Sequence, residues 1–79
     1  MKAQTPREAL LTRLAALKQL RTDHLGWRGS AASAHASSVR FGQHYGVVYH
    51  GTRVRLLTEA LAVVEAELEK VEIELKAYE

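Results

Sequence analysis

The chain has 79 residues, no cysteine and a formal net charge of +2. This length allows one small domain with a modest core, so we expect oligomerisation or very regular helix packing to supplement it. The absence of cysteine excludes disulfides, thiolate metal sites and cysteine catalysis. No apolar run is long enough to span a bilayer and no leader peptide is recognisable, which predicts a cytoplasmic protein without membrane contact.

The charge is distributed unevenly along the chain. Residues 1–55 carry nine Lys or Arg side chains against two acidic ones, a net charge of +7. Residues 56–79 carry two Lys against seven Glu, a net charge of −5. Opposite signs at the two ends favour antiparallel association, and a basic segment can also contact phosphate.

The first predicted helix begins at Pro6. Thr5 can accept a hydrogen bond from the third helical amide, Pro6 suits the first helical position, and Glu8 can complete a capping box. Leucines at a spacing of three or four residues then form one apolar face: Leu10, Leu14 and Leu17. We expect this helix to cover residues 6–25, with Leu25 as its last apolar position.

A turn is predicted at residues 26–29, where Gly26 and Gly29 flank the single tryptophan. Glycines at a helix end adopt the left-handed conformation that stops the helix. Ser30 can then cap a second helix. Trp27 is expected to pack against the apolar end of the resulting helical hairpin.

Residues 31–53 allow two interpretations. The run Tyr45–Tyr49 between glycines fits a short β-hairpin within residues 39–53. Small and apolar residues at helical spacing favour a helix instead: Ala31, Ala34, Ser38, Phe41, Tyr45, Val48 and Thr52. We favour one long helix over residues 30–78, with a bend within 42–51, where the apolar pattern shifts register.

The C-terminal part carries the strongest pattern, an unbroken a/d seam typical of a coiled coil. Its residues are Val54, Leu57, Leu61, Val64, Leu68, Val71 and Leu75. A short first helix covers only part of a second helix roughly 73 Å long, so a second copy should cover the remainder. The predicted fold is all-α: a helical hairpin with a short first helix and a long coiled-coil-like second helix, assembled as an antiparallel dimer or four-helix bundle.

The segment Trp27-Arg28-Gly29-Ser30-Ala31-Ala32-Ser33-Ala34 resembles the turn of the small W-x-G helical-hairpin proteins, the early-secreted-antigen-like substrates of type VII secretion. Trp27 and Gly29 match the turn of that family, and the small residues that follow match the start of its second helix. The resemblance implies two helices joined at the W-x-G turn, antiparallel dimers, and a role as a secreted effector or chaperone.

Catalytic and metal chemistry are not predicted. The four histidines, His24, His35, His44 and His50, never occur three or four residues apart, which is the spacing that helical metal sites use. The chain also lacks a nucleophile elbow and a phosphate-cradling loop. We therefore expect no enzyme activity, no cofactor and no metal.

The predicted function is that of a small non-catalytic interaction or adaptor protein, which self-associates through the heptad seam and contacts a protein partner. Trp27 and Phe41 are predicted to join the seam as contact residues. One alternative is binding of nucleic acid or an acidic partner through the basic middle segment, by Arg28, Arg40, Arg53 and Arg55. Another is a phage or mobile-element protein that binds and inhibits a host target.

Overall fold

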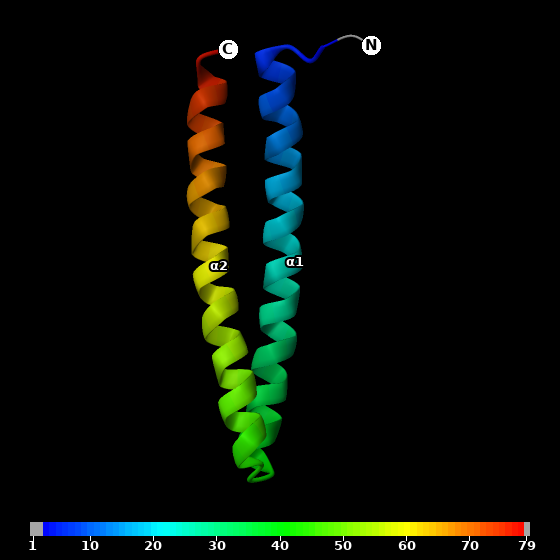
Figure 1. Ribbon diagram of the computed structural model, residues 1–79, viewed down its shortest axis with the longest axis vertical. Helices are drawn as coiled ribbons and strands as arrows, with labels where there is room; N and C mark the ends of the chain where they lie inside the picture. Colours follow the sequence, from blue (N-terminus) through cyan, green and yellow to red (C-terminus); the bar gives the residue numbers. More distant parts are fainter. Residues whose placement is uncertain (1–2, 79) are drawn as a thin grey trace.

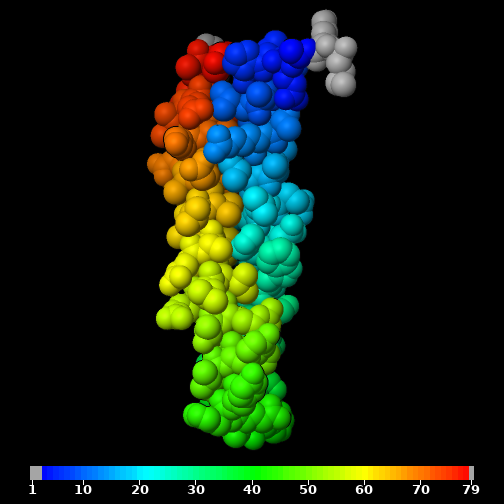
Figure 2. Space-filling model, in the orientation of Figure 1, coloured from blue at the N-terminus to red at the C-terminus, as the bar shows by residue number. Residues whose placement is uncertain are grey.

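The computed structural model describes residues 3–78 and shows two long antiparallel helices joined by a short turn (Figure 1). Helix α1 spans Pro6–Arg40 and helix α2 spans His44–Lys76. The molecule measures 56 × 26 × 13 Å, so it is one helix thick. Figure 2 shows the elongated shape, with side chains of the N-terminal and C-terminal halves lying side by side. The predicted all-α helical hairpin is confirmed. The β-hairpin alternative is not found, because residues 3–78 contain no strand.

The start of α1 follows the prediction. The Thr5 hydroxyl oxygen accepts a hydrogen bond of 3.2 Å from the amide of Glu8, and Pro6 occupies the first helical position. The first turn of a helix has amides without backbone partners, so a capping hydroxyl satisfies one of them. This cap fixes where α1 begins.

The turn lies at residues 41–43, and the predicted turn at 26–29 is wrong. Gly42 has a φ of +66°, which is the left-handed conformation that ends a helix. The amide of Gly42 donates to the carbonyl of Val39 at 3.3 Å, and the amide of Gln43 donates to the carbonyl of Ser38 at 2.8 Å. These two bonds form a Schellman motif. The first helix is therefore 35 residues long rather than short, and the two helices are nearly equal in length.

Trp27 and its flanking glycines lie inside α1. Both glycines are helical, although each costs about 1 kcal/mol relative to Ala in a helix interior. Trp27 is 51% exposed, and its ring lies 5.0 Å from that of His24. The expected packing of Trp27 at the end of the hairpin is not observed, and the turn implied by the W-x-G resemblance is absent here.

The heptad seam of α2 packs against α1 of the same chain. Its central residues are all buried: Leu61, Val64, Leu68 and Val71. Val54, Leu57 and Leu75 are half-buried at its ends. The seam is thus a packing face, as its spacing predicts. The expectation of a second copy on this seam rests on a short first helix that leaves part of it uncovered. That premise does not hold, because α1 is 35 residues long and packs against α2.

The residues of α1 that face this seam change along the helix from apolar to polar or small. Near the N-terminus it consists of the predicted half-buried leucines, Leu10, Leu14 and Leu17. Beyond them the half-buried or buried positions include His24, Arg28, Ala31, His35 and Ser38. Leu25 is exposed rather than part of this face. The apolar pattern therefore stops midway although the packing continues.

Near the turn the two backbones approach closely. A Cβ atom at Gly46 would clash with the Ser38 hydroxyl and lie 3.0 Å from the Ser38 Cβ. A Cβ atom at Gly51 would lie 3.3 Å from the His35 ring. The first contact is shorter than real Cβ atoms show and the second is tighter than most, so glycine permits the approach at position 46 and eases it at position 51. Small residues thus pack closely near the turn, within one chain.

At the other end, an ion pair links the helices. The guanidinium of Arg13 lies 2.6 Å from the carboxylate of Glu67. The pair is largely solvent-exposed, so it contributes only about 0–1 kcal/mol to stability. The apolar seam, and not this pair, holds the helices together.

Candidate interaction surface

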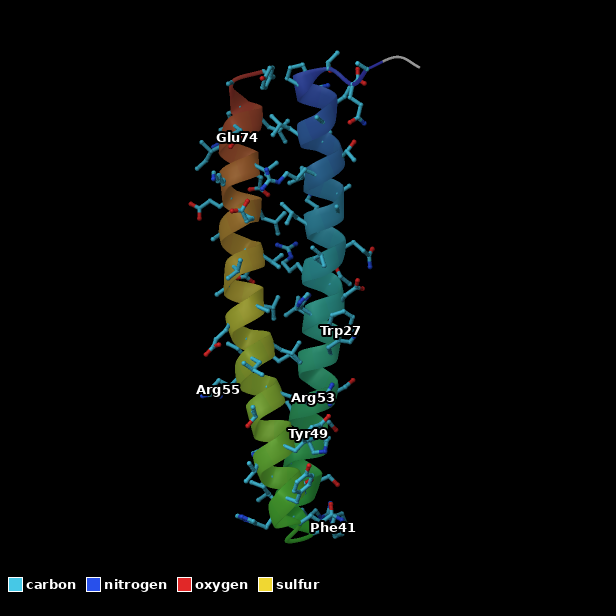
Figure 3. The ribbon with its side chains drawn as sticks, in the orientation of Figure 1. Trp27, Phe41, Tyr49, Arg53, Arg55 and Glu74 are labelled. Carbon is cyan, nitrogen blue, oxygen red and sulfur yellow. The ribbon has the colours of Figure 1, made fainter. Side chains whose placement is uncertain are left out.

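An open groove lies on α2 close to the turn. Its volume is about 350 Å³, and all of its lining residues belong to α2: Tyr45, Val48, Tyr49, Thr52, Arg53 and Leu56. Figure 3 shows Tyr49 and Arg53 near the end of the hairpin that carries the turn. Small-molecule sites usually enclose most of the ligand. A groove built on one helix leaves its ligand open to solvent, so it fits the surface of a macromolecule better.

The aromatic side chains of this groove are ordered by helical spacing. The rings of Tyr45 and Tyr49 are nearly parallel, with centroids 6.3 Å apart and 7° between their planes. The guanidinium of Arg53 lies 5.9 Å from the centroid of the Tyr49 ring. Residues four apart share one face of a helix, which places these groups together. They form an aromatic surface with a positive charge at its edge.

The groove is the end of a longer row of exposed residues, the outer stripe. Its members follow a second series of alternating steps of three and four: Tyr45, Tyr49, Thr52, Leu56, Glu59, Val63, Ala66, Lys70, Ile73 and Ala77. Every one of them is exposed. At 3.6 residues per turn, the stripe lies roughly 140° around α2 from the buried seam. Its large apolar members, Leu56, Val63 and Ile73, lie mostly in solvent, as with Val63 at 65% exposure.

Charge separates the two ends of the hairpin. The tip, defined as residues 24–58, carries four arginines and no Asp or Glu. The open end, residues 5–23 and 59–78, carries acidic side chains on both helices. The tip is therefore positive all round, while the open end has mixed charge.

The predicted basic residues do not form one cluster. Arg53 borders the groove, whereas Arg55 points away from α1 (Figure 3). Two residues on a helix that are two apart face different sides, which explains this separation. Arg28 is half-buried on α1, and Arg40 lies 5.7 Å from the Phe41 ring at the turn.

The predicted partner-binding residues divide into two groups. The central seam residues are buried against α1, and Val54, Leu57 and Leu75 at its ends are half-buried. Trp27 and Phe41 are exposed, Phe41 at 69%, on α1 and at the turn. The residues that sequence reasoning missed are those of the outer stripe. Their signal was present as the second heptad series within α2.

Within residues 3–78, no group of three or more His, Asp or Glu side chains could hold a metal ion. In the same range, the Nδ1 atom of His50 is buried and has no hydrogen-bond partner. Neither described helix is long and apolar enough to cross a membrane. Comparison of the chain with family models, curated proteins and solved structures finds no match.

Proposed function

We propose that this protein is a non-catalytic helical interaction module that self-associates through the outer stripe of α2. The observation that carries this proposal is the run of exposed Leu56, Val63 and Ile73 at heptad spacing. Exposed apolar rows of this kind mark protein contacts. The proposed contact face is therefore not the seam that the sequence predicts but the outer stripe, on the other side of α2.

The thinness of the hairpin supports the same proposal. Among residues 3–78, each helix packs only on the other, and the buried apolar residues are Ala31 and four residues of the seam. Chains of this size need an additional source of stability. A second copy laid antiparallel on the outer stripe would bury a second apolar layer and give α2 a neighbour on two sides.

Light scattering coupled to size-exclusion chromatography tests the proposal. We expect the wild-type chain, of 8.8 kDa, to elute as a dimer over a range of concentrations. Val63→Glu should be a monomer, because it places a charge in the apolar contact. Its circular dichroism should be unchanged, because Val63 faces solvent in the hairpin.

Val39→Glu is the matched control. Val39 lies on α1, outside the outer stripe, and is 57% exposed. The same substitution at similar exposure should leave the dimer intact. A wild-type chain that stays monomeric at every concentration, or a dimeric Val63→Glu variant, contradicts the proposal.

A second candidate function, binding of single-stranded nucleic acid at the tip, is favoured by the absence of acidic residues there. Arg53 beside the Tyr45–Tyr49 pair combines a phosphate contact with rings on which bases can stack. Fluorescence anisotropy with labelled single-stranded DNA and RNA at about 50 mM salt tests this. Arg53→Ala should weaken binding, whereas Arg7→Ala at the open end should not. No binding by the wild-type chain rejects this candidate.

A further inference from the structure

We infer that two copies of the chain pair α2 against α2 in one antiparallel register, in which Glu59 of each copy meets Lys70 of the other. This inference rests on the self-association proposed above and adds the register of the contact. It identifies the partner of the outer stripe as a second outer stripe.

The first step of the inference is the pair of charges within the stripe. Between Thr52 and Ala77 the stripe is apolar or small except for Glu59 and Lys70. Both side chains are exposed, and neither takes part in an ion pair within residues 3–78. A charge brought into an apolar contact is costly unless an opposite charge meets it. Any dimer through this stripe must therefore place Glu59 and Lys70 next to opposite charges.

The second step is the geometry of antiparallel pairing. When Glu59 faces the partner's Lys70, counting in opposite directions places Leu56 opposite the partner's Ile73 and Val63 opposite the partner's Ala66. Along the contact the layers are Leu56/Ile73, then Glu59/Lys70, then Val63/Ala66, and the same three follow in reverse order. Because the dimer has two-fold symmetry, each of these layers occurs twice.

Neighbouring registers lack this match. Sliding the partner by one heptad places Glu59 opposite either Val63 or Ala77 of the other copy. In both cases Lys70 also faces an uncharged residue, so four charges in the dimer lose their counterparts. The charge pattern of the stripe thus selects one register among those that the heptad spacing permits.

The register also leaves the aromatic end of the groove uncovered. Thr52 faces the partner's Ala77, which directly follows the last residue of α2, so Tyr45 and Tyr49 lie beyond the overlap of the two α2 helices. The dimer would present two such groove ends, one at each extremity. A further ligand could bind there without displacing the partner.

Reciprocal charge reversal tests the register. Glu59→Lys and Lys70→Glu, each alone, turn both salt bridges of the dimer into like-charge contacts. Each should raise the dimer dissociation constant by at least about tenfold, measured by sedimentation equilibrium. The double variant Glu59→Lys/Lys70→Glu exchanges the charges and should restore the wild-type constant to within about threefold.

Glu65→Lys is the control for net charge. It changes the charge of the chain as much as Glu59→Lys does, but it lies off the stripe and is exposed. It should leave the dissociation constant unchanged. If the wild type dimerises but the single reversals have no effect, or the double variant is as weak as either single one, this register is wrong while the proposed self-association stands. A monomeric wild type overturns both.

Discussion

The two ends of the hairpin hold their helices together in different ways. At the open end, leucines and valines of α2 are inserted between the helices, as with Val71, which is 1% exposed. Near the turn, small residues meet, and Gly46 lies directly against Ser38. The first end relies on buried apolar area, and the second on close backbone approach. The stability of the hairpin should therefore fall when side-chain volume is removed at the open end, and also when volume is added at the tip.

The largest expected effect is at the open end. Leu68→Glu places a carboxylate in the buried seam between α1 and α2, where nothing compensates it. We expect a loss of at least about 4 kcal/mol and a largely unfolded chain at 25 °C. Circular dichroism and urea titration measure this. The control is Val63→Glu, which places the same side chain at an exposed position of α2. A folded Leu68→Glu variant would show that the seam is not the core of the hairpin.

An intermediate effect is expected at the tip. Gly46→Ala adds a methyl group where Ser38 leaves no room, and should destabilise the hairpin by about 1–3 kcal/mol in urea unfolding. The double variant Ser38→Ala/Gly46→Ala removes the hydroxyl nearest to that methyl group, so part of the loss should return. Equal stability of Gly46→Ala and wild type would mean that the helices are farther apart at the tip than described.

The smallest expected effect is a change in thermal stability that tests where the chain turns. A Cβ atom at Gly29 would meet nothing within 4 Å, so Gly29→Ala should stabilise the protein by about 1 kcal/mol through helix propensity alone. The same substitution at Gly42, which has a φ of +66°, should destabilise it. Thermal unfolding compares the two. If the signs were reversed, the chain would turn at 26–29, as in the W-x-G proteins.

Part of this fold could be predicted because its signals are local. Thr5 and Pro6 predict the start of α1, and the heptad seam predicts a packing face of α2. The position of the turn could not, because Gly29 and Gly42 are equally able to end a helix. Which of them adopts a positive φ depends on where the other helix packs, and that is a tertiary property.

The length of α1 escaped prediction for a related reason. Its inner face continues through His24 and Arg28, which are half-buried although they are polar. Long side chains can cover apolar surface with their stems while the charged group reaches water. Apolar periodicity therefore predicts that α1 ends at Leu25, which lies about two turns beyond Leu17, the last leucine of α1 at the interface.

The candidate surface was only half visible in the sequence. The aromatic and basic residues near Tyr49 stand out by composition. The outer stripe does not, because Glu59 and Lys70 interrupt its apolar pattern. Two heptad series coexist in α2, and the sequence does not state which of them faces α1. The rotation of α2 about its own axis decides that, and the long leucine and valine seam prevails because it buries more apolar area.

Both ends of the described chain, near Thr5 and Tyr78, emerge side by side at one extremity of the rod (Figure 1). A cargo attached to either end would sit most of the 56 Å length away from the Tyr45–Tyr49 groove. Within one copy, labels or fused domains at either end would therefore leave its own groove clear, whereas in the antiparallel pair they would lie close to the groove of the partner. In an antiparallel pair, the cargoes of the two copies would be held at opposite extremities, which makes the hairpin a rigid spacer of fixed length.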